Sequence, residues 1–456
     1  MKNQKINFIY MLACCLAFTG CDKYLDITPK GKTLLSTVDN YDQFLNDDKF
    51  FQGATAPSAY TYLNILSDNY DFVTVKTPAI DPTELVYTWS LQFTTDINSS
   101  PPMWGDHYGR INLYNSVLAG IDNATGGSAA KKRSIKAEAL LGRALEYFYL
   151  VNEYGKPYDG ATAQQDPGVP FVTSNDVSQK VPGRSSVAEI HQHIIDDVNS
   201  AIADLPSDNS ANRLRGSKAA GYSVLARTYF YMRNYPEARR YAELALSNTK
   251  AVMINFNAAL PATNFISIHP DVIYGRIFLP LYPAQLDFMR SFATNDLRVR
   301  KLYSGGDGYT FTTRGATLYA PVYISPTLQY GNPGTSVQEM KLTIAECAAR
   351  SGDLTEALTQ LNDIRRNRFS NYTDYSSSDQ TAVLDQVFLE RRHEIPFNGL
   401  RWFDMRRLDK ENRMGTVTRY NAQNTAIVTL PPHSNRYTLQ IPFQVISFNP
   451  DMQQNP

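Results

Sequence analysis

Apolar positions return with the period of an α-helix in several separate stretches of this 456-residue chain. The longest runs from residue 134 to 154 and stops at Gly155 and Pro157, and another runs from 186 to 205 and stops at Pro206. A first, shorter helix is expected near residues 38–45. The pattern therefore predicts a mainly all-α fold.

Between residues 222 and 246 the pattern becomes that of a tetratricopeptide repeat, in which small residues let two antiparallel helices approach and large ones fill the groove. We expect Ala226 and Ala238 at the crossing of this helix pair. A second partial match covers 342–366, with Gly352-Asp353 in its turn. Chance amphipathic helices explain the joint spacing poorly, so we predict a scaffold of helix pairs over about 104–250 and 336–410.

Two stretches without helical period, about 52–102 and 255–333, are rich in proline or glycine and in aromatic residues. The chain holds 29 Tyr, 22 Phe and 3 Trp, and binding groups gather on loops that a rigid body supports. Any single one of these rings is more often a packing residue than a ligand contact. The ligand-binding candidates are Tyr70, Tyr87, Trp89, Tyr282, Tyr309 and Tyr323.

The N-terminus has the pattern of a bacterial lipoprotein signal. Lys2 and Lys5 precede an apolar run over 6–18 that is too short to span a bilayer, and Gly20-Cys21 follows. We expect a signal peptide over 1–20, a lipidated Cys21, a tether over 21–35 and one domain over 36–456. An ordinary signal peptide or an uncleaved anchor is the alternative.

Charge and motif content exclude several classes of function. The 44 basic residues balance 44 acidic ones, so nucleic acid is not an expected partner. His191 and His193 lie two apart on a helix and cannot share a metal, and Cys347 sits among alanines as a small core residue. We therefore predict no cofactor, no metal site and no catalytic residue.

The strongest local motif lies late in the chain and combines carboxylates, arginines and aromatic residues. We expect Glu390 and Glu394 to pair with Arg391, Arg401 or Arg406, while Trp402 and Phe403 pack inward. A zinc helix is excluded because Pro396 ends the helix after His393-Glu394. Two glutamates on one helix face also do not suit a glycosidase. The motif residues are Glu390, Arg391, Glu394, Gly399, Arg401, Trp402, Asp404 and Arg406.

This motif resembles that of the SusD/RagB family of outer-membrane nutrient-binding lipoproteins. Ala137-Glu138-Ala139, Leu361-Asn362-Asp363 and Asn449-Pro450 are similar to further family segments, so the resemblance covers nearly the whole chain. It implies a tetratricopeptide body, a fatty-acylated anchor on the outer face of the outer membrane and a SusC-like TonB-dependent transporter as partner. The implied ligands are oligosaccharides, or peptides in some members, and no ligand-contacting residue can be carried over.

The sequence thus favours a non-enzymatic, surface-exposed protein that captures oligosaccharides for import. A tetratricopeptide adaptor that binds only protein would explain the repeats but neither the anchor nor the aromatic, loop-rich stretch over 255–333, which we call the aromatic insertion. A surface glycosidase has no catalytic motif to support it.

The anchor gives a first prediction. Replacing Cys21 by Ala removes the thiol that carries the lipid, so we expect the Cys21→Ala protein to leave the membrane fraction on cell fractionation. Retention of that variant in the outer membrane at the parental level would contradict the lipoprotein interpretation.

Overall fold

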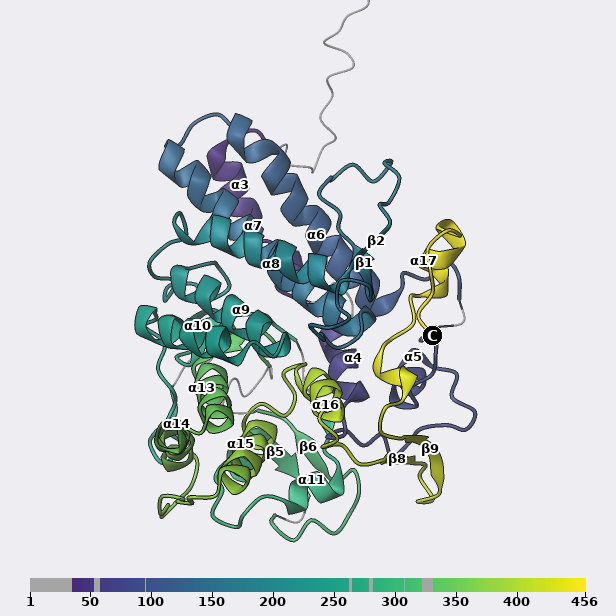
Figure 1. Ribbon diagram of the computed structural model, residues 1–456, viewed down its shortest axis with the longest axis vertical. Helices are drawn as coiled ribbons and strands as arrows, with labels where there is room; N and C mark the ends of the chain where they lie inside the picture. Colours follow the sequence, from purple (N-terminus) through teal and green to yellow (C-terminus); the bar gives the residue numbers. More distant parts are fainter. Residues whose placement is uncertain are drawn as a thin grey trace, which may run out of the picture.

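Antiparallel helix pairs form the main body of the protein (Figure 1). The computed structural model describes residues 35–52, 58–94, 96–261, 265–278, 282–306, 308–321 and 331–456. The longer helices are α6 (Pro102–Gly120), α7 (Ala129–Tyr154), α8 (Val187–Ile202), α9 (Lys218–Tyr231), α10 (Tyr235–Asn248), α13 (Val337–Ser351), α14 (Leu354–Arg366), α15 (Gln380–Glu394) and α16 (Arg401–Asp409).

Successive helices pack on one another, so the body continues from pair to pair. α6 packs on α7, α7 on α8 and α8 on α9; α9 then pairs with α10, which contacts α13, and α13 packs on both α14 and α15. In Figure 1 this path runs from the top of the molecule down its left side. The predicted mainly α-helical, tetratricopeptide-like scaffold is confirmed, and the helices expected over 134–154 and 186–205 are α7 and α8.

The α9–α10 pair crosses where the repeat pattern predicts it. Ala226 and Ala238 are both fully buried. Beside them, the Tyr229 and Tyr241 rings stack with centroids 5.5 Å apart and planes 2° from parallel. In the second predicted pair, Gly352 adopts a left-handed conformation (φ 85°) that ends α13, and Asp353 caps α14.

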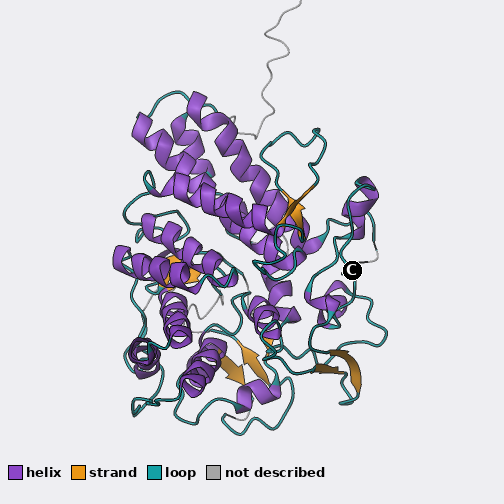
Figure 2. Ribbon diagram, viewed as in Figure 1, coloured by secondary structure: helices purple, strands orange, loops and turns teal. Residues whose placement is uncertain are grey.

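Shorter elements fill much of the right-hand side and the lower part of the view in Figure 1, and one short helix lies at the top. Strands are few and short (Figure 2), and all of them pair antiparallel, as β1–β2, β3–β7, β8–β9 and a sheet in the order β4-β6-β5. The shorter helices are α3 (Val38–Phe44), α4 (Ala59–Leu66), α5 (Pro82–Tyr87), α11 (Leu286–Arg290), α12 (Arg298–Leu302) and α17 (Phe443–Phe448). The strands are β1 (Pro167–Pro170), β2 (Arg184–Ser186), β3 (Val272–Tyr274), β4 (Tyr282–Pro283), β5 (Tyr303–Gly305), β6 (Thr317–Tyr319), β7 (Thr335–Ser336), β8 (Val417–Tyr420) and β9 (Ala426–Leu430).

The expectation of loops alone over 52–102 is wrong, because α4 and α5 lie there. All but one of the residues of α4 are buried, so its sequence has no polar face from which a helical period could be read. α5 has only six residues, and its ends are fixed locally: Asp81 and Glu84 form a capping box.

The late motif does form a buried charge network, but the predicted partners of Glu390 and Glu394 are wrong. Glu390 pairs with Arg298 at 2.6 Å, and Glu394 pairs with Arg298 at 3.0 Å and with Arg368 at 2.7 Å. Arg298 belongs to α12, about ninety residues earlier in the chain, so spacing within the motif gives no sign of it.

The arginines of the motif contact other groups instead. Arg391 pairs with Asp404 at 2.9 Å, and Arg401 pairs with Asp68 at 2.7 Å. Arg406 donates to the carbonyl oxygen of Gly155. Trp402 and Phe403 are buried as predicted.

Cys347 is buried, as expected of a core residue, and burial raises the pKa of its thiol above the usual range. Over the described ranges, no helix is both long and apolar enough to cross a bilayer. Within the same ranges, no cluster of three or more His, Cys, Asp or Glu side chains is arranged to hold a metal ion.

α6 is held against α7 by a fully buried ion network around His107. The His107 imidazole lies between two carboxylates, with Nδ1 2.7 Å from Glu146 Oε2 and Nε2 3.0 Å from Glu153 Oε1. Burial by itself lowers the pKa of His107, but the carboxylates of Glu153 and Glu146 outweigh it and raise the pKa to about 9. Arg110 adds a second cation, 2.8 Å from Glu146.

The helix crossing gives the first prediction from the fold. A leucine at position 226 overfills the α9–α10 contact, so Ala226→Leu is expected to lower the free energy of unfolding by about 1 to 3 kcal/mol. Thermal melting checks this, with Ala130→Leu, at an exposed position of α7, as the control that leaves the midpoint unchanged. Equal midpoints for both variants would contradict close packing at Ala226.

The His107 network predicts a pH dependence of stability. Folding raises the pKa of His107 from its ordinary 6.5 to about 9, so its contribution is complete below pH 6.5 and is lost as pH rises through about 9. The loss is at most about 1.4 kcal/mol per pH unit for one proton.

Chemical unfolding of the wild-type protein and of His107→Gln across this range tests it. We expect the stability difference between them to shrink with rising pH. Parallel stability curves would show that His107 does not gain a proton on folding.

Candidate functional site

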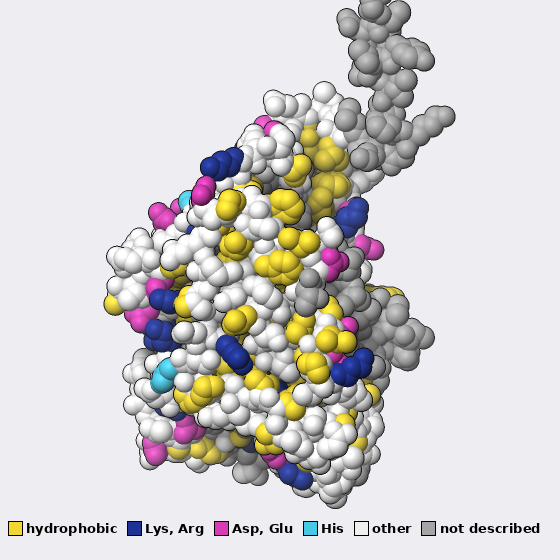
Figure 3. Space-filling view, turned by 90° about the vertical axis from the view of Figure 1, so that its right-hand side faces the viewer, with side chains coloured by type: hydrophobic (Ala, Val, Ile, Leu, Met, Phe, Trp, Pro, Cys, Tyr) yellow, Lys and Arg dark blue, Asp and Glu magenta, His cyan; other side chains and the backbone are white. Residues whose placement is uncertain are grey.

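A groove of about 990 Å³ is bounded by α6, by the segment 171–182 between β1 and β2, and by α17 with residues 97–100. We call it the α6–α17 groove. It lies on the side of the molecule that faces the viewer in Figure 3, where hydrophobic side chains gather in several places.

The floor of the groove is one face of α6. Pro101 and Pro102 start this helix, since proline is tolerated where the backbone N–H groups have no helical partner. Trp104, Tyr108 and Ile111 then follow at helical spacing and line the groove. The Trp104 and Tyr108 ring centroids lie 4.9 Å apart, and the Tyr108 hydroxyl donates to the Pro170 carbonyl at 2.7 Å, which fixes that ring.

The first wall is the 171–182 segment, which α6 holds through side-chain amides. Asn115 Nδ2 donates to the carbonyl of Val172 at 2.9 Å, and Asn112 Nδ2 donates to that of Asn175 at 3.1 Å. Phe171 stacks on His193 of α8 with centroids 3.9 Å apart. The base of the wall is therefore anchored, while its tip is exposed.

The second wall is α17 together with the loop before α6, and amides hold it too. Gln444 Nε2 donates to the Asp96 carbonyl at 3.1 Å, and Gln92 Oε1 accepts from the Phe443 backbone N–H at 2.9 Å. Phe448, at the end of α17, is 82% exposed.

The groove is uncharged over most of its lining. Asp176 and Lys180 are the charged residues among those that line it, and the other polar groups are hydroxyls and amides such as those of Ser100, Thr173 and Gln179. Large apolar side chains form its exposed edges, and they are Ile97, Val177, Val181 and Phe448. This lining suits a neutral ligand that has apolar faces bordered by hydroxyl or amide groups.

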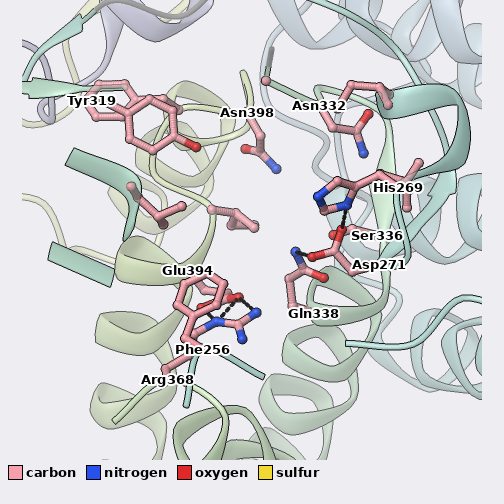
Figure 4. Close-up of a pocket in the computed structure, with 16 residues that line it drawn as sticks. Phe256, His269, Asp271, Tyr319, Asn332, Ser336, Gln338, Arg368, Glu394 and Asn398 are labelled. Carbon is pink, nitrogen blue, oxygen red and sulfur yellow. Dashed lines mark hydrogen bonds and ion pairs between the residues drawn. The ribbon is translucent and has the colours of Figure 1, made fainter. Parts of the chain in front are cut away.

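A second cavity, drawn in Figure 4, is small and polar, with a volume of about 60 Å³ as the described residues bound it. The His269 and Asp271 side chains contact at 2.6 Å, and Gln338 donates to Asp271 at 3.2 Å. The Arg368–Glu394 pair faces them from the other side. A ligand pocket usually measures about 300 to 1,000 Å³, so this cavity suits a few water molecules and not a sugar or a peptide.

The structure brings four of the six ligand-binding candidates into one cluster, but inside the protein. The ring centroid of Tyr70 lies 5.8 Å from that of Tyr87 and 5.9 Å from that of Tyr282. The Arg419 guanidinium lies 4.4 Å from the ring centroids of both Tyr87 and Trp89. None of these four aromatic side chains is more than 5% exposed. They join the two loop-rich stretches as core residues, and without rearrangement they present no ring face to a ligand.

The remaining candidates differ in position. Tyr309 is partly exposed, and its hydroxyl donates to the Asp296 carbonyl at 2.6 Å. Tyr323 and the lipidation candidate Cys21 lie outside the described residues. Ligand contact by the six rings stays a prediction, with Tyr309 the one whose observed position suits it.

Sequence reasoning did not single out the groove residues. Phe171, Val177 and Phe448 come from a short polar connection and from the C-terminal end, neither of which has a strong periodic signal. The sequence feature that could have indicated the groove is the Pro101-Pro102 pair, which starts a helix with aromatic residues on one face.

Two family models match the chain: one described as "Starch-binding associating with outer membrane" over residues 23–230, and the other as "SusD family" over 338–456. A SusD-like protein of Bacteroides ovatus is 27% identical over 239 residues, which are 50% of this chain and 39% of that protein. The chain thus matches well under half of that relative's length.

Solved structures share the fold. A putative sugar binding protein from Bacteroides vulgatus is 21% identical, with a TM-score of 0.72 over 93% of this chain and 99% of that one. A SusD superfamily protein from Bacteroides fragilis is 19% identical, with a TM-score of 0.73 over 92% and 100%. With both family models in agreement, the chain belongs to the SusD/RagB family, a carbohydrate-binding family that is associated with the outer membrane and does not consist of enzymes.

Proposed function

We propose that this protein is a lipid-anchored receptor on the cell surface that captures oligosaccharides in the α6–α17 groove. It passes them to a SusC-like TonB-dependent transporter in the outer membrane. The observation that carries the ligand assignment is the groove itself, which is large, almost uncharged and lined by aromatic rings beside hydroxyls and amides.

The chemistry of sugars supports this assignment. A sugar ring has flat C–H faces bordered by hydroxyls, so it packs on an aromatic face while the amides and hydroxyls beside that face bond its edge. One ring face that covers about 50 Å² contributes about 1.2 kcal/mol. Two or three such contacts, after the cost of association, give roughly micromolar to millimolar affinity. Weak capture suits a receptor that releases its ligand to a transporter.

Capture of peptides is the second candidate, and a specific feature of the groove favours it. Ile97, Val177, Val181 and Val445 add branched aliphatic groups to the lining, and these suit apolar side chains better than sugar hydroxyls. The binding panel below therefore contains peptides as well as neutral oligosaccharides.

Calorimetry on alanine variants tests the site. Phe171→Ala removes an aromatic ring from the groove and is expected to weaken binding of the panel's best oligosaccharide at least threefold, about 0.65 kcal/mol. Phe265→Ala, at a ring that is 54% exposed and does not line the groove, is the matched control and leaves affinity unchanged. Melting curves establish that both variants are folded.

Tyr309→Ala provides the competing measurement. If it weakens binding and Phe171→Ala does not, the ligand lies on the aromatic insertion and the groove assignment is wrong. Peptide binding without oligosaccharide binding would favour the second candidate function.

A further inference from the structure

A second hollow of about 630 Å³ lies next to the α6–α17 groove, at the end of α17. The second hollow is lined by Pro167, by residues 179–184 and by residues 448–453. Six residues line both hollows, and they are Gln179, Lys180, Val181, Pro182, Phe448 and Asn449. They form a shared neck, with the tip of the 171–182 wall on one side and the end of α17 on the other.

Two large apolar side chains are exposed at the neck. Phe448 is 82% exposed and Val181 is 40% exposed. Phe448 is the aromatic residue among the six, so it is the ring that a molecule lying through the neck would cover.

The base of each side of the neck is fixed. Arg184, directly after the wall, donates to the carbonyls of Gly168 at 2.7 Å and Gln453 at 2.8 Å, and so ties β1 to the C-terminal segment. Asn449 Nδ2 donates to the Val445 carbonyl at 2.9 Å, which closes the end of α17. The residues that both hollows share are therefore held in place from both sides.

Charge in the second hollow is also nearly balanced. Its charged lining residues are Lys180, Arg184 and Asp451. The Arg184 guanidinium donates hydrogen bonds to carbonyl and amide oxygens, and burial lowers its pKa to about 10. Lys180 is left as one exposed cation. One solvent-exposed lysine adds little electrostatic attraction for an anionic ligand. The two hollows therefore do not select a polyanion.

We propose that the two hollows form one extended binding site for a linear, neutral oligosaccharide of several units, with Phe448 as the contact that selects for length. This inference rests on the proposed function. Short fragments occupy the α6–α17 groove, where they meet Phe171, and only longer chains pass the neck and cover Phe448. Both compartments of this site are open to solvent.

Affinity as a function of ligand length tests the proposal. The probes are a disaccharide, a tetrasaccharide and an octasaccharide, first as linear starch fragments and then as fragments of the neutral glycan that the wild-type protein binds best. We expect the octasaccharide to bind wild-type protein more tightly than the disaccharide. Phe448→Ala should weaken octasaccharide binding roughly five- to tenfold, the value for about 50 Å² of uncovered ring face, and should leave disaccharide binding unchanged.

Phe171→Ala supplies the matched comparison, because Phe171 lines the first hollow only. It should weaken all lengths by the same factor. Equal affinity of the wild-type protein for all lengths would overturn the proposal, and so would a Phe448→Ala protein that still prefers the octasaccharide to the same degree. If no oligosaccharide of any length binds the wild-type protein, the proposed function itself fails, and this inference fails with it.

Discussion

Fully buried arginine side chains, each paired with carboxylates or carbonyls, connect the irregular segments of this protein to its helices. Arg298 of α12 contacts Asp296, Glu390 and Glu394, and so ties the 255–333 stretch to α15. Arg227 of α9 pairs with Glu339 at 2.6 Å and donates to the carbonyls of Pro333 and Gly334. A buried guanidinium without its partner costs about 3 to 5 kcal/mol, so these segments are held in one position.

This constraint explains why the aromatic side chains of the 52–102 stretch are not exposed to a ligand. Arg419 donates to the carbonyls of Ile65 and Ser67 and lies against the Tyr87 and Trp89 rings. Tyrosine and tryptophan are needed there because they pack against a cation and also satisfy polar groups: Trp89 Nε1 donates to the Leu66 carbonyl at 3.0 Å. High aromatic content in this chain therefore largely reflects internal packing around arginines. The ligand surface that we propose lies elsewhere, on segments whose bases are held by side-chain amides.

The scaffold could be predicted from the sequence because the residues that pack a helix pair recur at regular spacings within a short stretch of the chain. Ala226, Ala238 and Gly352 are fixed by contacts within one or two turns of neighbouring helices, and spacing reveals such contacts. The partners of Glu390 could not be predicted, since Arg298 lies about ninety residues away and any of many arginines satisfies the same pattern. The groove was missed for a related reason. Its walls come from three distant parts of the chain, and exposed side chains such as Val177 and Phe448 follow no period.

The central claim is that the ligand lies in the α6–α17 groove and not on the aromatic insertion. A crystal structure of the protein with a bound oligosaccharide tests it most directly. The account predicts electron density for sugar rings against Phe171 and over the floor formed by Tyr108, with longer chains reaching Phe448. Density for the ligand at Tyr309 or elsewhere on the insertion, with the groove empty, would contradict it.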